Sequence, residues 1–259
     1  MVNNFFIARD FDWEVRRSSH LDRALNVIAR RLGTQIYTAP IIDRLILTLT
    51  GFRLSATWSG SSTNLEQRIN IYHLVSQVLA YEVEGDLVEV GCNEGQSSIL
   101  IRTVMNDFKL QKAFHVYDSF SGLPDTRAED GTSYKAGDLA VSEAAFRKNF
   151  ADRGLSIPVI HKGWFSDTLP TGLPDRICFA YLDGDLYDSI MVSLEHAYPR
   201  LSKGAICLID DYCDTAVDPH GWNELPGVKK ACDDFLADKP EKICYLYSGS
   251  YTHGFFRKL

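Results

Sequence analysis

Two short apolar stretches that end in aspartates constrain the fold of this chain more than any other feature. Residues 178–182 run directly into Asp183, and residues 204–209 run directly into Asp210 and Asp211. The segment between them has apolar residues at the spacing of an amphipathic helix. Strand, helix and strand in this order predict a right-handed βαβ unit, in which both strands are parallel. The fold class is therefore α/β, and we expect the three aspartates to converge where open α/β sheets bind ligands.

Several carboxylates in one cleft repel one another unless a cation neutralises them. Mg²⁺ suits such a site, because it takes oxygen ligands and keeps water molecules that a substrate can replace. The pattern therefore predicts a magnesium site made by Asp183, Asp210 and Asp211. The alternative is that these acids cap helices and solvate the edge of the sheet.

The composition excludes several classes of protein. The formal charge is −7 and no block of lysine and arginine stands out, so we expect no nucleic-acid partner. The first ten residues lack the pattern of a signal peptide, and the longest apolar segment, 41–49, is too short to span a bilayer, so we expect no membrane partner. The six cysteines form no CxxC pair, and Cys178, Cys207 and Cys244 lie within predicted strands, where a free thiol is expected to be buried. This predicts a reduced, cytoplasmic protein without zinc.

Two parts of the chain differ in character. Residues 1–62 suggest a helical extension, with helices over 11–32 and 40–50 and no catalytic pattern. We expect this extension to form a lid, a contact in a homodimer, or both; plain structural packing is the alternative. Residues 63–259 carry all the motifs and are predicted to form one large domain.

A strand over residues 85–91 leads into a glycine turn and a helix. Gly91 and Gly95 allow the backbone to approach a ligand, and Ser97 adds a donor at the start of the helix. The spacing is GxxxG and not the GxGxxG of dinucleotide-binding proteins.

The next strand, 113–117, ends in Asp118, the position at which nucleoside-binding folds bind ribose hydroxyls. The alternative is that Asp118 caps the turn that follows. A long polar loop over residues 125–140 is typical of a lid or a substrate wall. Trp164, in a predicted turn, either lies against a purine or packs a helix onto the sheet.

Six motifs in order resemble the macrocin-type O-methyltransferase family, which methylates sugars and phenols of antibiotics. They are GDLVEVG (85–91), DSFSGLP (118–124), GWFSDTLP (163–170), LDGDLY (182–187), IDDY (209–212) and LPG (225–227). The resemblance implies a doubly wound, seven-stranded class I methyltransferase sheet, similar to a Rossmann fold. The final two strands, over 243–257, are expected to form an antiparallel hairpin.

The resemblance also implies a set of site residues. It assigns Asp183, Asp210 and Asp211 to Mg²⁺. The cofactor S-adenosylmethionine is expected to contact Glu89, Gly91, Gly95, Ser97, Asp118, Ser119, Trp164 and Asp183. Related catechol methyltransferases have a catalytic lysine where this chain has Leu186, so the base must come from elsewhere. We expect Asp183 to be the base, with His220 as the second candidate.

These observations favour a magnesium-dependent O-methyltransferase that acts on a small hydroxylated molecule, a sugar or a phenol. Two alternatives remain at the level of the sequence. One is a glycosyl- or phosphoryl-transferase that holds Mg²⁺ through Asp183 and Asp185. The other is a catalytically silent partner that binds the cofactor.

Overall fold

The computed structural model describes residues 63–108, 110–249 and 251–259. The helices expected over 11–32 and 40–50, and the lid or dimer contact expected of residues 1–62, lie outside the described residues. Within the described part, no helix is both long enough and apolar enough to cross a membrane. All six cysteines lie in the described ranges and are free thiols.

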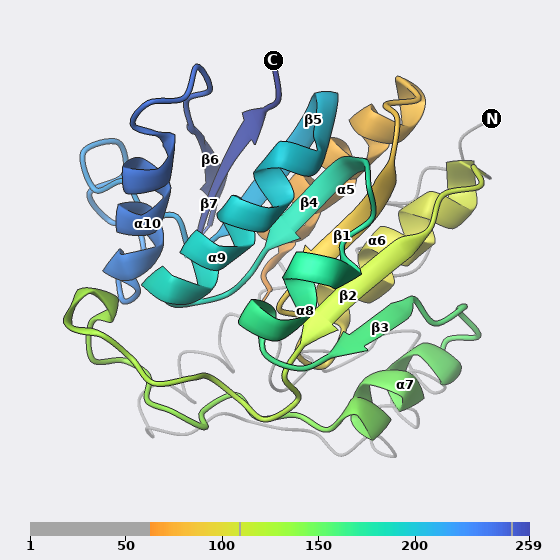
Figure 1. Ribbon diagram of the computed structural model, residues 1–259, viewed down its shortest axis with the longest axis horizontal. Helices are drawn as coiled ribbons and strands as arrows, with labels where there is room; N and C mark the ends of the chain where they lie inside the picture. The colour runs from red at the N-terminus through yellow and green to blue at the C-terminus, as the bar shows by residue number, and fades with distance from the viewer. Residues whose placement is uncertain (1–62, 109, 250) are drawn as a thin grey trace, which may run out of the picture. The chain divides into compact units, whose positions relative to one another are not determined.

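Seven strands form one sheet in the order β3-β2-β1-β4-β5-β7-β6 (Figure 1). The strands are β1 (Asp86–Val90), β2 (Phe114–Asp118), β3 (Val159–Lys162), β4 (Ile177–Leu182), β5 (Leu201–Asp210), β6 (Cys244–Ser248) and β7 (Tyr251–Arg257). The first five strands pair in parallel, whereas β7 is antiparallel to both β5 and β6. The predicted class I methyltransferase sheet with its closing hairpin is confirmed.

The centre of the sheet is apolar because helices cover both of its faces. All six residues of β4 are buried, as are four of the five residues of β1. Continuous apolar strands are typical of a parallel sheet covered on both sides. The strand order reverses between β1 and β4, and ligands bind at such a switch point, beyond the carboxyl ends of the strands.

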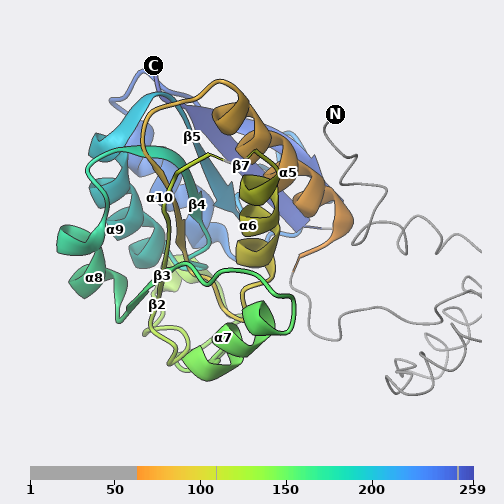
Figure 2. The ribbon, with the colours of Figure 1, turned by 90° about the vertical axis from the view of Figure 1, so that its right-hand side faces the viewer.

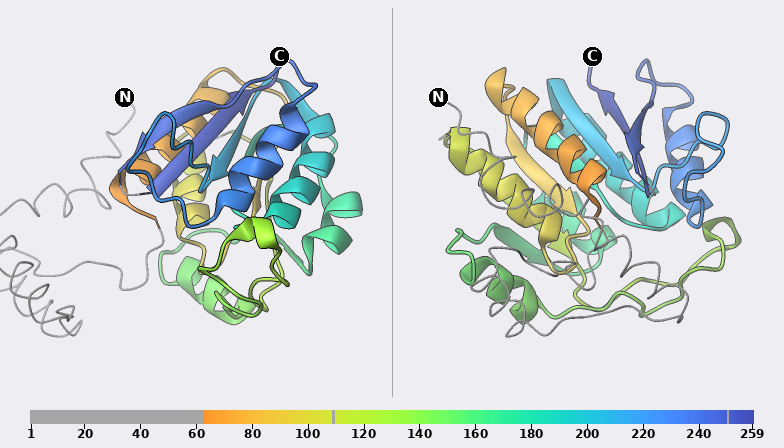
Figure 3. Two further views of the ribbon diagram at one scale, coloured as in Figure 1. Left: turned by 90° about the vertical axis from the view of Figure 1, so that its left-hand side faces the viewer. Right: turned by 180° about the vertical axis from the view of Figure 1, so that it is seen from behind.

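Figures 2 and 3 show one set of helices on each face of the sheet. One face is covered by α5 (Leu65–Ala80) and α6 (Gln96–Phe108), and the other by α8 (Phe165–Gly172), α9 (Tyr187–Ala197) and α10 (Pro226–Leu236). Helix α7 (Glu143–Ala151) buries Phe146 and Phe150 near the start of α6. Two 3₁₀ turns, η1 (Ala128–Asp130) and η2 (Tyr198–Arg200), complete the described elements.

Two local expectations were wrong. Residues 163–170 were expected to be a turn because Gly163 and Pro170 are turn signals in sequence. They contain most of α8, and Pro170 lies inside the helix. Cys244, expected to be buried within a strand, is exposed, because β6 is the edge strand of the sheet.

Candidate functional site

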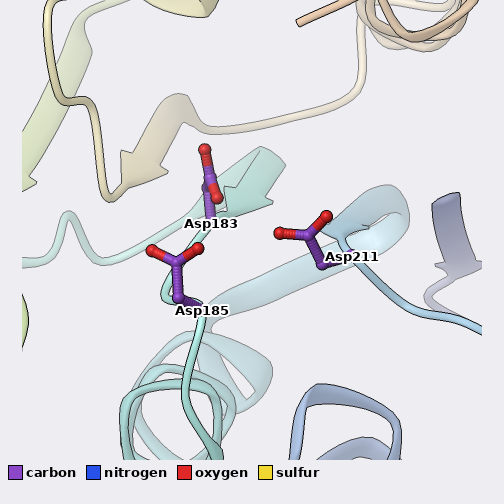
Figure 4. A group of neighbouring side chains, drawn as sticks. All are labelled: Asp183, Asp185 and Asp211. Carbon is purple, nitrogen blue, oxygen red and sulfur yellow. The ribbon is translucent and has the colours of Figure 1, made fainter. Parts of the chain in front are cut away.

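Three carboxylates meet at the carboxyl ends of β4 and β5. Ligand oxygens of Asp183, Asp185 and Asp211 all lie within 4.8 Å of one another. The strands bring them together, because Leu182 pairs with Ile209 and the acids follow at the end of each strand. Figure 4 shows Asp211 reaching from the end of β5 toward the two aspartates of the turn after β4. We call these three residues the acid cluster.

The backbone of the acid cluster is held in an uncommon conformation. Asp185 and Asp211 have φ angles of 60° and 55°, in the left-handed region that residues with a Cβ seldom adopt. The amide of Leu186 donates a hydrogen bond to the carbonyl of Gly184 at 2.6 Å, which makes the turn after β4 tight. Such strained residues persist only where the surrounding structure fixes them, and they occur frequently at functional sites.

The acids of the cluster have raised pKa values. Burial raises the pKa of Asp183 well above its usual range, and the charges of Asp210, Asp185 and Asp211 raise it further. Burial, followed by the charges of Asp210 and Asp118, raises the pKa of Asp185 to about 7. Burial, followed by the charges of Asp210 and Asp185, also raises the pKa of Asp211 well above its usual range. Without a cation, part of the cluster is therefore protonated near neutral pH.

The donor set of the acid cluster fits a hard divalent cation. All three groups offer carboxylate oxygens, the ligands that Mg²⁺ prefers. They come from two short segments that the parallel strands hold side by side. A bound cation would offset their repulsion and keep them ionised.

Asp210, expected as the third metal ligand, is not in the group of potential ligands found among the described residues, whereas Asp185 is. One of its oxygens, Oδ1, accepts a hydrogen bond from Gln67 of α5 at 2.8 Å and lies 2.7 Å from His253 Nε2. Asp210 is the last residue of β5 and pairs with His253 of β7, while the chain turns at Asp211. Asp210 thus lies outside the acid cluster but near enough for its charge to raise the pKa of Asp183.

Sequence reasoning missed His253 and Gln67, which are both fully enclosed. Asn70 places its side-chain nitrogen 3.4 Å from His253 Nδ1 and donates to the carbonyl of Tyr247 at 3.0 Å. The ring of His253 therefore lies between Asn70 and Asp210, with Nδ1 toward the first and Nε2 toward the second. Only the antiparallel position of β7 beside β5 brings these residues together, and the sequence pattern does not give that order.

Both glycines of the turn after β1 are required by contacts within the protein. Gly91 has a φ of 88°, and an added Cβ would lie 1.8 Å from the carbonyl oxygen of Asp183. Gly95 has a φ of 85°, and an added Cβ would lie 2.7 Å from the ring of Phe146. The first glycine therefore lets the end of β1 approach the turn that carries the acid cluster. The glycines were expected to let the backbone approach a ligand; in the structure, Gly91 lets it approach the backbone of Asp183.

Glu89 is fully buried and accepts hydrogen bonds from the hydroxyls of Ser97 and Ser98 at the start of α6. Burial raises the pKa of Glu89 to about 7, although the two serine hydrogen bonds lower it. Glu89 and Ser97, both expected to contact the cofactor, are therefore hydrogen-bonded to each other. Ser98 is an additional partner that the sequence did not indicate.

Asp118 lies at the end of β2, as expected, and accepts hydrogen bonds from amides of the glycine turn. Its Oδ2 accepts from the amides of Cys92 at 3.0 Å and Asn93 at 2.9 Å, and its Oδ1 accepts from Phe120 at 2.7 Å. The alternative role, capping the local turn, is thus present in the structure. A carboxylate has about four acceptor positions, so Asp118 retains capacity for a ligand hydroxyl. The hydroxyl of Ser119 is engaged within the same turn, by the carbonyl of Gly122 and the amide of Ser121.

Two further expected residues lie at the surface. The side chain of Trp164 is 41% exposed at the start of α8, so it is not packed in the core between helix and sheet. His220 is exposed on the loop between β5 and α10, and its amide donates to Asp218. It is not in the group of potential metal ligands found in the described part of the chain.

Tyr134, on the long loop between β2 and α7, is a residue that sequence reasoning missed. Its side chain is half-buried and packs against the core. Burial, followed by the charges of Asp185 and Asp211, raises the pKa of Tyr134, so its phenol lies within electrostatic reach of the acid cluster. The loop runs along the carboxyl edge of the sheet toward α10 (Figure 1), and its expected role as a lid or a substrate wall stays a prediction.

Comparison with known proteins gives one consistent family. A sequence model described as Macrocin-O-methyltransferase (TylF) matches residues 60–236. Demethyldecarbamoylnovobiocin O-methyltransferase of Streptomyces niveus is 38% identical over 170 residues, which are 58% of this chain and 63% of that protein. Mycinamicin III 3''-O-methyltransferase of Micromonospora griseorubida is 30% identical over 216 residues, which are 76% and 85% of the two chains.

A third relative has a name that includes a sugar. It is 8-demethyl-8-(2,3-dimethoxy-alpha-L-rhamnosyl)-tetracenomycin-C 4'-O-methyltransferase of Streptomyces olivaceus, 39% identical over 158 residues, or 57% of this chain and 60% of that protein. The matches with the Streptomyces proteins thus span less than two thirds of their lengths. The solved structure of the O-methyltransferase NovP has a TM-score of 0.64 at 30% identity, covering 75% of this chain and 80% of NovP. The family expected from the six motifs is confirmed.

Proposed function

We propose, since the chain belongs to the macrocin O-methyltransferase family, that it transfers the methyl group of S-adenosylmethionine to a sugar hydroxyl of a natural product. The observation that carries this proposal is the acid cluster at the ends of β4 and β5, beside the switch point between β1 and β4. The family match favours methyl transfer over the glycosyl- or phosphoryl-transferase that an isolated DxD pattern allows. The presence of the acid cluster favours an enzyme over a catalytically silent partner, because a silent protein would not need these carboxylates.

The proposed cofactor site uses the acids at the ends of β1 and β2. S-Adenosylmethionine carries a ribose, whose hydroxyls need acceptors, and an ammonium group, which needs a negative partner. Asp118 and Glu89 are acids of the required kind at the required strand ends. Gly91, Gly95, Ser97, Ser119, Trp164 and Asp183 are proposed to surround the cofactor, as expected from the resemblance.

The proposed cation is Mg²⁺, with Asp183 and Asp211 as ligands in both the expected set and the observed cluster. The observed geometry supports Asp185 as the third ligand, whereas the sequence predicted Asp210. Asp185→Asn and Asp210→Asn variants separate these assignments, because only loss of a ligand should strongly raise the Mg²⁺ concentration that activity requires.

In methyl transfer, a bond forms between the acceptor oxygen and the methyl carbon, the bond from that carbon to sulfur breaks, and the acceptor oxygen loses its proton. When bound, the cofactor supplies the methyl group and the cation lowers the pKa of the acceptor hydroxyl. A carboxylate of the acid cluster takes the proton. Asp183 remains our first candidate, and Asp185 becomes another because its carboxylate lies in the same cluster. His220 is a weaker candidate because it is exposed on a loop.

The proposed acceptor is a sugar attached to a larger molecule, as in the rhamnosyl group named in one relative. Aromatic side chains near the cluster support a carbohydrate ligand. After burial and the charges of Asp185 and Asp211, Tyr251 also contributes to the raised pKa of Tyr134, and Trp222 packs edge-on against Tyr251 with ring centroids 5.8 Å apart. Such rings offer apolar faces beside polar groups, as ligand sites require.

The test is transfer of a trideuterated methyl group from labelled S-adenosylmethionine to a panel of deoxysugar glycosides and their aglycones, followed by mass spectrometry. We expect the label on the sugar of at least one glycoside and on none of the aglycones. Calorimetry with a nucleotide sugar serves as the control for the transferase alternative. Cofactor binding without transfer to any glycoside or phenol in a broad panel would contradict the proposal.

We also propose that the protein is a homodimer and that residues 1–62 contribute to the dimer contact or cover the site. The basis is the amphipathic pattern of that segment. Light scattering of the full chain and of a chain lacking residues 1–58 measures the assembly state. If both proteins contained the same number of subunits and had the same activity, this role would be contradicted.

A further inference from the structure

Asp130 is an almost fully buried acid, 3% exposed, on the loop between β2 and α7. Both of its oxygens accept backbone hydrogen bonds. Its Oδ2 accepts from the amide of Arg127 within the loop, at 2.7 Å, and its Oδ1 accepts from the amide of Tyr187 at 2.6 Å. The second bond crosses from the loop to the first residue of α9. Burial of a carboxylate is unfavourable unless such partners surround it.

Helix α9 has no side-chain cap of its own. The residue at its cap position is Leu186, which has no polar side-chain atom to accept from the first-turn amides. Asp130 supplies the missing acceptor from a segment 57 residues away in sequence. A negative charge at this end of a helix is also stabilised by the partial positive charge of the helix N-terminus.

The same carboxylate lies against the first turn of α10. A Cβ added to Gly227 would lie 2.3 Å from Asp130 Oδ1, so only a glycine lets the helix approach this closely. Helix α10 begins after Leu225, which also makes no side-chain cap. Asp130 therefore lies between the N-termini of two helices, hydrogen-bonded to α9 and packed closely against α10.

The hydrogen bond to Tyr187 acts on the turn that carries the acid cluster. Tyr187 follows Asp185 by two residues, and Asp185 is held at a φ of 60°. A strained turn of this kind needs support from outside. Because Asp130 fixes the residue at which the turn enters α9, it limits the positions that the Asp185 carboxylate can take.

We propose that Asp130 is a positioning residue, whose buried carboxylate caps α9 from the long loop and thereby holds the Asp183–Asp185 turn in the geometry that binds a divalent cation. The proposal rests on the proposed function only in taking the acid cluster as a cation site. Groups that orient metal ligands without touching the metal typically change metal affinity by about 10- to 100-fold when they are removed.

Two variants perturb the same contact from opposite sides. Asp130→Asn removes the charge and replaces one of the two acceptor oxygens by an amide nitrogen, which cannot accept. One of the hydrogen bonds from the Tyr187 and Arg127 amides is therefore lost, and the other is weakened. Gly227→Ala retains the carboxylate but pushes on its Oδ1 from α10. Asp138→Asn is the matched control, since Asp138 accepts from the Lys135 amide at 3.0 Å within the same loop and makes no bond to α9.

The experiment measures three quantities on the full chain: hydrogen exchange of the Tyr187 amide, affinity for Mn²⁺ as a probe cation, and affinity for S-adenosylmethionine. Asp130→Asn and Gly227→Ala should exchange the Tyr187 amide faster and bind Mn²⁺ about 10- to 100-fold more weakly. Cofactor affinity should fall much less than Mn²⁺ affinity, because Asp118 and Glu89 lie on β2 and β1 and only Asp183 of the proposed cofactor contacts lies in the perturbed turn. Asp138→Asn should match wild type in all three.

Wild-type Mn²⁺ affinity in both variants, measured on folded protein, would overturn the proposal, as would a wild-type chain with no affinity for Mn²⁺. An unchanged Tyr187 exchange rate in both variants would also overturn it. Failure of the proposed function has a different signature. A wild-type protein that binds Mn²⁺ through this turn but methylates no glycoside would contradict methyl transfer and leave the role of Asp130 standing.

Discussion

At the scale of single residues, the acids at the ends of β1 and β2 have two tasks. Glu89 holds Ser97 and Ser98 at the start of α6, and Asp118 holds three backbone amides around the glycine turn. Both residues shape the segment that would contact the cofactor. A change at either position therefore affects the turn and the ligand together, and experiments must separate the two effects.

Asp118→Ala should weaken S-adenosylmethionine binding by about 10- to 100-fold. A hydrogen bond to a charged group contributes about 1.5–3 kcal/mol, which corresponds to this range of affinity. Isothermal calorimetry measures the change, and the melting temperature reports any loosening of the turn. Ser121→Ala, on the exposed part of the same turn, is the control and should bind normally. If Asp118→Ala bound S-adenosylmethionine as tightly as wild type, the assignment of Asp118 to the cofactor site would be contradicted.

Glu89 should make stability depend on pH. Its folded pKa of about 7 exceeds the unfolded value of 4.5, so the folded state holds the proton more tightly. The free energy of unfolding therefore falls as pH rises from the lower to the higher of these values, by about 3 kcal/mol for this group. Glu89→Gln cannot ionise, so its stability should fall less steeply than that of wild type, where Glu89 and the acid cluster both contribute, whereas the exposed Glu195→Gln should match wild type. Urea denaturation across this pH range measures the difference.

At the scale of elements, the site depends on how closely the ends of the strands approach one another. Gly91, at the end of β1, leaves no space for a side chain beside the carbonyl of Asp183. The amide of Asp183 in turn donates to the carbonyl of Val90 at 2.8 Å. The end of β1 and the acid-bearing turn after β4 therefore form one unit, in which a shift of either strand moves the acid cluster.

Gly91→Ala should destabilise the fold more than Gly204→Ala does. Both glycines have similar positive φ angles, 88° and 84°, but a Cβ at Gly204 meets its nearest atom at 3.7 Å instead of 1.8 Å. Each variant should lose about 1–3 kcal/mol from backbone strain, and Gly91→Ala should lose more because it also displaces Asp183. Denaturant midpoints give the comparison. Equal losses in the two variants would show that the close approach is not required.

At the scale of the whole molecule, the sequence predicted the topology well because each element carries its own signal. The buried strand β4, the helix α9 and the acids beyond β5 appear in order along the chain, and their handedness follows from general rules. The strand count and the closing hairpin are also confirmed. Asp183 and Asp211 were predicted to converge for the same reason, and they do.

What the sequence could not predict depends on contacts between distant segments. The direction of the Asp210 carboxylate is set by Gln67 and His253, and these become neighbours only once the sheet is assembled. The role of Asp130 is hidden in the same way, since its partner Tyr187 is far along the chain. Asp185, which the sequence assigned to Mg²⁺ only in the alternative transferase, enters the cluster through a left-handed backbone conformation.

The central claim is that methyl transfer takes place at a divalent cation held by the acid cluster. The most direct measurement is the rate of methyl transfer by the full chain after removal of bound metal, in excess chelator and again after Mg²⁺ is restored. The rate should vanish in chelator and return with Mg²⁺, while calorimetry shows S-adenosylmethionine still bound through the ends of β1 and β2. Asp211→Asn should behave like chelation. Full turnover in excess chelator, after the metal has been removed, would contradict the account and leave the cluster with a structural role alone.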